Sequence, residues 1–227
     1  MRTKDFGGLL AHAALALIPV TIATAALAQA LPPTTPPAIA PTLVPGASVD
    51  LMTAEGAAAL GAQWKTMEAK IVEGPALNGA QPGYKTSYDI APHAGESGFD
   101  DSAWPTLEPK GLGNRLGGGK VSFIWYRTNL TIPEKIGGFD PKDAKAVLTA
   151  YVDDYAEVWV NGVLPRAAGR PSPATIQGFN MPNRLVLRDS VEVGERFEIA
   201  VFGINGPISA APANFLWFRE AKVEFFR

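Results

Sequence analysis

The stretch that most constrains the fold is residues 147–160, where two runs of strand-forming side chains follow one another. Alternation with a period of two, rich in β-branched and aromatic residues, is typical of β-strands. Asp153 and Asp154 interrupt the pattern, because two neighbouring carboxylates cannot both enter an apolar core without partners. Asn161-Gly162 follows directly and favours a tight turn, since both residues tolerate positive φ. The stretch therefore predicts antiparallel β-structure.

The same pattern continues on both sides of this stretch, with proline, glycine and asparagine in the gaps. Residues 52–61 are the one predicted helix, with Thr53 as its cap. Many short strands with turn-forming residues between them predict an all-β sandwich or barrel. The longer predicted strands cover residues 121–132, 147–152, 155–160, 184–188, 196–204 and 214–226.

Residues 1–30 are typical of a signal peptide. A short basic start precedes an unbroken apolar run at 7–28, and small residues predict cleavage near Ala28 or Ala30. A retained membrane anchor is the alternative, because the run approaches spanning length, but Pro19 within it favours cleavage. The sequence has no cysteine, which excludes disulfides and a cysteine-linked lipid anchor. We expect a periplasmic or secreted protein without membrane contact after cleavage.

A proline-rich linker is predicted at residues 31–47, because this stretch lacks charge and its prolines cannot join a sheet or a helix. The remaining residues, 48–227, are enough for one well-buried domain. The formal net charge is −2, with acids and bases intermixed. Nucleic-acid partners are not expected, since proteins that bind them usually carry a basic face.

Four segments carry motifs in a fixed order: FDDSAW (99–104), WYRTNLTIPE (125–134), the run from 151 to 162, and VEVGERFEIAVFGIN (191–205). Together they resemble the galactose-binding-like jelly-roll domain at the front of family 2 glycoside hydrolases. The resemblance implies a jelly-roll β-sandwich and a carbohydrate or related small ligand. It covers roughly residues 95–226.

A closer resemblance adds the segments PHAGESGFDDSAW, GFNMPNR and AVFGINGPIS. This set is similar to the accessory β-sandwich of some bacterial gluconolactonase/regucalcin-like proteins. In that family the lactonase chemistry resides in a separate propeller with its own metal ligands. The resemblance therefore implies an accessory domain, whose partner could be an exported lactonase or another exported enzyme.

The sequence contains few combinations of residues that could form a catalytic site. His93 is the only histidine after the predicted signal peptide, and no neighbouring serine lies in a nucleophile-elbow motif. Zinc would require more histidine or cysteine ligands than the sequence offers. Asp153 and Asp154 are expected to point to opposite faces of a strand, so they would not form an acid–base pair. We therefore expect a binding protein more than an enzyme.

Asp100 and Asp101 in FDDSAW are expected to accept hydrogen bonds from turn N–H groups. One acid of this pair, or of Asp153 and Asp154, could instead help to hold a structural Ca²⁺, which takes oxygen ligands from loops. The resemblance also implies such an ion. No ligand set follows from the sequence.

A sugar site needs flat aromatic surface and planar polar side chains. If Ala156, Val158 and Val160 face inward, then Trp159 lies on the other face beside Glu157. Trp217 and Arg219 share a face in the same way, and Trp125 and Tyr126 are further aromatic candidates. The predicted ligand-binding residues are Trp159, Trp217, Arg219, Asn180, Asn205, Arg127, Asp153 and Asp154.

The function expected from the sequence is an exported, non-catalytic carbohydrate- or ligand-binding module, with the loops at 93–104, 177–184 and 205–214 as the rim of its site. The alternative is an accessory domain that docks onto a lactonase or another protein instead of a sugar. A docking surface should show a contiguous apolar patch, whereas a sugar site should be a small groove with an aromatic floor.

Overall fold

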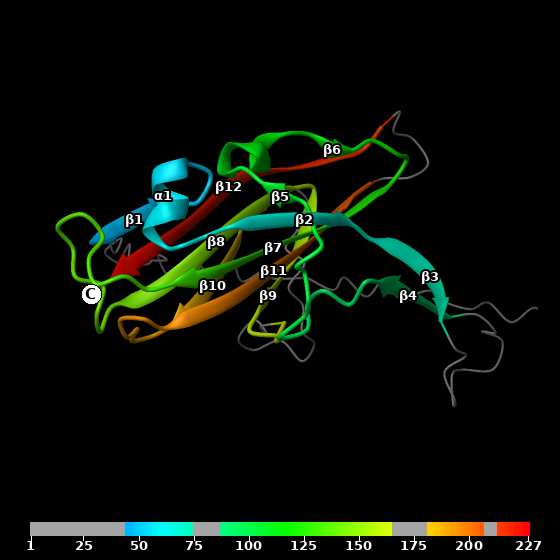
Figure 1. Cartoon of the computed structure of the whole chain (residues 1–227). Coiled ribbons are helices and arrows are strands. Elements are labelled where there is room, and N and C mark those ends of the chain that lie inside the picture. Colours follow the sequence, from blue (N-terminus) through cyan, green and yellow to red (C-terminus); the bar gives the residue numbers. More distant parts are fainter. Residues whose placement is uncertain (1–43, 75–86, 165–180, 207–212) are drawn as a thin grey trace, which may run out of the picture. The chain divides into compact units, whose positions relative to one another are not determined.

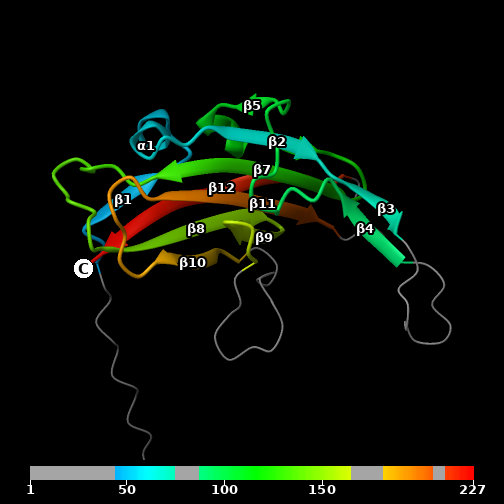
Figure 2. The same cartoon turned by 60° about the horizontal axis from the view of Figure 1, so that its bottom comes forward.

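The computed structural model describes residues 44–74, 87–164, 181–206 and 213–227. Its strands form two five-stranded sheets and one separate two-stranded ribbon (Figures 1 and 2). All strand pairs in these ranges are antiparallel. The predicted all-β sandwich is thereby confirmed, while its assignment to the galactose-binding-like class stays a prediction. The predicted signal peptide and most of the linker lie outside the described residues.

Sheet I has the strand order β1-β12-β8-β10, and β6 also pairs with β12. Its strands are β1 (Ala47–Asp50), β6 (Leu116–Gly117), β8 (Lys145–Asp153), β10 (Asn183–Arg188) and β12 (Phe215–Phe226). Sheet II has the order β5-β2-β7-β11-β9. Its strands are β2 (Trp64–Glu68), β5 (Thr106–Leu107), β7 (Ser122–Thr131), β9 (Tyr155–Val160) and β11 (Arg196–Asn205). The ribbon pairs β3 (Lys70–Gly74) with β4 (Ser87–Ala91).

Among the described residues, helical structure is limited to α1 (Ala54–Ala59) and the 3₁₀ turn η1 (Pro109–Gly113). The predicted cap is confirmed, because the Thr53 hydroxyl accepts a hydrogen bond of 3.0 Å from the N–H of Gly56. Within the described ranges no helix is long and apolar enough to span a membrane.

The main core lies between the two sheets and is dense in aromatic rings. Phe218 of β12 meets Tyr126 of β7 edge-on, with ring centroids 5.0 Å apart, and lies 5.6 Å from the ring of Trp64. All three side chains are almost fully buried. Such ring pairs add stabilisation beyond the area that they bury. Tyr126, a ligand candidate from the sequence, is therefore a core residue, because it alternates inward on β7.

A second apolar cluster covers the other face of sheet II. It contains Trp125 and Phe202, whose rings lie 4.8 Å apart, together with Ala94, Trp104 and Ala200. The loop between β4 and β5 supplies Ala94 and Trp104, so this loop packs over the outer face of the sheet. Most of β7 is consequently buried on both faces, including the polar side chains of Ser122, Arg127 and Thr128.

The chain passes from one sheet to the other at Asp153 and Asp154. β8 ends at Asp153 in sheet I, and β9 begins at Tyr155 in sheet II. The residues that interrupt the sequence pattern thus mark a corner of the sandwich. The turn predicted at Asn161-Gly162 is confirmed, since both residues have positive φ and Val160 bridges Val163 across them.

Two neighbours on β12 allow a matched test of this packing. Phe218 is fully buried between the sheets, whereas Trp217 lies on the opposite face and is partly exposed. We expect Phe218→Ala to lower the free energy of unfolding by about 3–5 kcal/mol, because it leaves a cavity among aromatic rings. Trp217→Ala should cost less than about 2 kcal/mol. Urea unfolding measures both values, and equal losses would contradict the two-faced arrangement of β12.

Candidate functional site

A pocket of about 220 Å³ opens between the β4–β5 loop and the outer face of sheet II. We call it the Trp159 pocket. It is lined by Asp89, Ile90, His93, Gly95, Glu96, Trp125 and Trp159. The lining comes from β4, from the loop that follows it, and from strands β7 and β9, so residues far apart in the sequence build one site.

Two indole rings form the apolar part of the pocket. Trp159 faces away from the main core because Ala156 and Val158 occupy the inward positions of β9, as the alternation predicts. Trp125 is held in place because its indole N–H donates a 2.9 Å hydrogen bond to the carbonyl of Pro92. Gly95 packs directly against the Trp159 ring, where an added Cβ would lie only 2.6 Å from a ring carbon. The loop backbone therefore fixes how the indole is presented.

A charged cluster anchors the loop that carries His93. Asp101 accepts a 2.8 Å hydrogen bond from Lys65 of β2 and a 2.9 Å hydrogen bond from the Nε of Arg127 of β7. The Arg127 guanidinium also donates to the carbonyl of Ala94. Burial by itself would raise the pKa of Asp101, but Lys65 and Arg127 outweigh it and hold that pKa below its usual value. The two cations therefore stabilise an ionised carboxylate in the loop.

Glu198 of β11 makes a second connection to the same loop. Its carboxylate accepts hydrogen bonds of 2.9 Å from the Ser97 hydroxyl and 3.0 Å from the N–H of Gly98. The backbone N–H of Glu198 donates to the side chain of Asn161, at 2.8 Å. The predicted rim at residues 93–104 is thus tied down at several points.

The polar rim of the pocket is a row of three ionisable side chains. His93 Nε2 lies 3.0 Å from an Asp89 carboxylate oxygen, and His93 Nδ1 lies 3.5 Å from Glu96. All three side chains are half or more exposed. Glu157 lies two positions before Trp159 on the same strand face, and burial raises its pKa. The pocket thus combines aromatic surface with groups that mostly accept hydrogen bonds.

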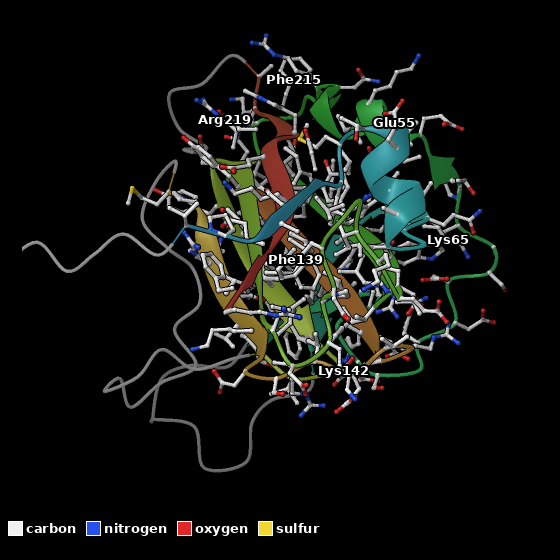
Figure 3. All side chains as sticks on the ribbon, turned by 90° about the vertical axis from the view of Figure 1, so that its left-hand side faces the viewer. Glu55, Lys65, Phe139, Lys142, Phe215 and Arg219 are labelled. Atoms are coloured by element: carbon white, nitrogen blue, oxygen red, sulfur yellow. The ribbon has the colours of Figure 1, made fainter. Side chains whose placement is uncertain are left out.

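A different cluster gathers five of the predicted site residues where β8 meets β12. Arg219 binds the buried carboxylate of Asp153 through Nε at 2.9 Å and through a second guanidinium nitrogen. Asn205 donates to Asp153 at 3.4 Å and to the carbonyl of Phe215. Arg219 sits at a β-bulge in β12 (Figure 3), which aims its side chain toward the rings of Tyr151 and Trp217.

The carboxyls of Asp153 and Asp154 hydrogen-bond to each other, so the prediction that they point to opposite faces is wrong. Strand alternation does not apply to them, because β8 ends at Asp153 and Asp154 lies in the corner between the sheets. Burial first, and then the contact with Asp153, raise the pKa of Asp154 to about 6. Below about pH 6, Asp154 therefore keeps its proton beside Asp153, which is paired with Arg219.

The structure divides the predicted site residues into three groups. Only Trp159 lines the pocket, whereas Trp217, Arg219, Asn205, Asp153 and Asp154 form the cluster between β8 and β12. Arg127 is buried and committed to Asp101 and Ala94, so it positions the loop. Asn180 and most of the predicted rim at 177–184 and 205–214 lie outside the described residues.

Sequence reasoning did not single out Asp89, whereas His93 and Glu96 fall within the predicted rim at 93–104 without being named as ligand-binding residues. No local pattern connects these residues with Trp159, which follows more than sixty positions later. Only the packing of the loop on sheet II brings them together. Aromatic residues in a β-rich sequence were the available signal, and Trp125 was a candidate for that reason.

In the part of the chain that the structure describes, no group of three or more His, Cys, Asp or Glu side chains is placed to hold a metal ion. Asp100 accepts the N–H of Ser102 at 2.9 Å, as expected for this turn. Asp101 and Asp153 are already paired with cationic side chains. Bound Ca²⁺ therefore stays a prediction without an assigned ligand set.

The raised pKa of Asp154 predicts a pH dependence of stability. The folded protein holds the proton up to about pH 6, whereas an unfolded chain releases it near about 3.9. The resulting stabilisation is complete below about pH 4 and is lost as the pH rises through about 6. In urea unfolding, Asp154→Asn should flatten this slope and gain about 1–3 kcal/mol over the parent at about pH 7.5.

Asp140→Asn is the matched control for that change. The Lys142 N–H and Lys135 lower the pKa of this exposed carboxylate, so removing its charge should bring no gain at neutral pH. Parallel pH–stability curves for the parent and Asp154→Asn would contradict the raised pKa of Asp154.

The contact between Gly95 and Trp159 predicts the effect of one added methyl group. Gly95→Ala should displace the indole or lift the loop, at a cost of about 1–3 kcal/mol. The indole N–H signal of Trp159 in a heteronuclear NMR spectrum should shift at the same time. Gly138→Ala is the control, because no heavy atom lies within 4 Å of its added Cβ. An unchanged indole signal in Gly95→Ala would show that the contact does not hold the ring.

No family model matches the chain, and no curated protein does. Among solved structures it is similar to a calcium-binding mutant of Bacteroides uniformis beta-glucuronidase 2, with a TM-score of 0.41, 17% identity, and coverage of 72% of this chain and 18% of that one. It is also similar to Faecalibacterium prausnitzii beta-glucuronidase, with a TM-score of 0.31, 14% identity, and coverage of 72% and 31%. The chain spans under a third of either enzyme chain. Similarities at this level carry no conclusion about function.

Proposed function

We propose that this protein is a carbohydrate-binding module that holds a sugar ring in the Trp159 pocket. The observation that carries the proposal is the pocket itself, with two indoles in its lining and Asp89, His93 and Glu96 at its rim. Aromatic faces suit the apolar face of a sugar ring, and the rim offers hydrogen-bonding partners for hydroxyl groups.

The size of the pocket favours a small ligand. Its volume of about 220 Å³ is below the roughly 300–1,000 Å³ typical of pockets for drug-sized ligands. A single ring, or the end of a longer chain, suits this space better than an extended ligand. The loop anchored through Asp101 and Glu198 supports a preformed site, which reduces the ordering cost of binding.

The motifs described above support two finer proposals. We assign the sandwich to the galactose-binding-like jelly-roll class, and we propose that the protein is exported by way of residues 1–30. Periplasmic or secreted placement suits a module for extracellular sugars. Both proposals rest on the sequence, and mass spectrometry of the mature N-terminus tests the second.

The alternative is that the domain docks onto a protein, such as a gluconolactonase-like enzyme. The β3–β4 ribbon favours this function, because Ile71, Val72 and Tyr88 on it are 47%, 38% and 72% exposed. Exposed apolar side chains on a short ribbon are typical of contact surfaces. This alternative becomes the better explanation if the protein binds no sugar.

Trp159→Ala tests the proposed site. In a screen of the full chain against neutral, amino and acidic monosaccharides, a ligand at about a hundred times its dissociation constant should raise stability by about 2.7 kcal/mol. Trp159→Ala should abolish this gain in the thermal unfolding curve. Trp217→Ala removes an indole from the other sheet and should retain the gain. Loss of binding in Trp217→Ala alone would place the site at the Asp153 cluster instead.

A further inference from the structure

Charge is distributed unevenly around the Trp159 pocket. Asp89 and Glu96 place two carboxylates at its rim, and His93 is the single basic residue in its lining. The nearby cations Lys65 and Arg127 are both committed to Asp101. The rim is therefore rich in negative charge and short of positive charge.

The polar groups at the rim of the pocket also accept more hydrogen bonds than they donate. The indole N–H of Trp125 is used by the carbonyl of Pro92, at 2.9 Å. The carboxylates of Asp89 and Glu96 are acceptors only when ionised. A neutral imidazole has one N–H, so His93 can donate to one of these carboxylates and leaves acceptor capacity on the other.

We propose that the pocket selects a protonated amino sugar, whose ammonium group donates to Asp89 and Glu96 while the ring lies against the Trp159 indole. This inference rests on the proposed function and specifies its ligand class. Ammonium groups have three donors and no acceptor, which matches the rim. Indole faces also attract cations, through the negative face of the ring.

Acidic sugars fit the same rim poorly. A uronate carboxylate would meet two carboxylates of like charge, and His93 is the single basic residue in the pocket lining. Proteins that bind carboxylates usually supply arginine forks. Arg127, which contacts the loop, is buried and already paired. We expect a neutral sugar to bind with intermediate affinity, because its hydroxyl groups can both donate and accept hydrogen bonds.

Calorimetric titration with four related sugars tests this inference on the full chain. The ligands are glucosamine, glucose, N-acetylglucosamine and glucuronate, at about pH 7, where most of an amine with a pKa of about 8 is protonated. We expect glucosamine to bind about tenfold more tightly than glucose or N-acetylglucosamine, which corresponds to about 1.4 kcal/mol. Glucuronate should bind most weakly, and added salt should reduce the preference for glucosamine.

Isosteric variants identify the carboxylates that carry the preference. Asp89→Asn combined with Glu96→Gln should remove the preference for glucosamine, so that glucosamine and glucose bind about equally. Glu55→Gln removes one charge from the exposed first turn of α1 (Figure 3) and should leave the preference intact. Both residues of the double variant are half or more exposed, so its unfolding temperature should stay close to that of the parent.

The outcomes separate this inference from the proposed function. Glucose binding that equals or exceeds glucosamine binding would overturn the amino-sugar inference and leave a sugar site in place. A preference that survives in the double variant would also overturn it. If none of the four sugars binds, both the inference and the proposed function fail.

Discussion

The candidate site depends on the interaction of Asp101 with Lys65 and Arg127. These contacts hold the β4–β5 loop against the outer face of sheet II, where Trp125 and Phe202 would otherwise meet water. Removing one partner from a buried ion pair is costly, because the remaining charge loses its compensation. The pocket is therefore a consequence of how the loop is anchored, and the same loop carries His93 and Glu96 of its polar rim.

The cluster around Asp153 and the Trp159 pocket differ in how far their polar groups are already hydrogen-bonded within the protein. Around Asp153 the charges are satisfied internally, since Arg219 and Asn205 donate to its carboxylate and the Asp154 carboxyl lies in hydrogen-bond contact with it. Such networks fix a corner of a fold. At the Trp159 pocket the carboxylates of Asp89 and Glu96 are half or more exposed, and His93 is the single basic residue in the lining. We assign ligand binding to the pocket because more hydrogen-bonding capacity remains there for a ligand.

Local patterns predicted most of the strands, the capped helix and the tight turn at Asn161-Gly162, since each depends on near neighbours in the chain. They also placed Trp159 on the outward face of β9. The geometry of Asp153 and Asp154 was predicted wrongly because strand alternation ends at a corner, and a sequence does not show where a strand changes sheets. Tyr126 was misjudged as a site candidate because both faces of β7 are buried.

The sequence by itself determined the all-β class, because period-two alternation and turn chemistry are local properties. It also limited the chemistry, since a chain without cysteine and with one histidine beyond its first thirty residues offers few catalytic sets. Only the tertiary structure decided which aromatic residues meet polar groups. Trp159 joins His93 and Asp89 because a loop folds back over sheet II, and contacts between distant segments are set by packing of the whole domain.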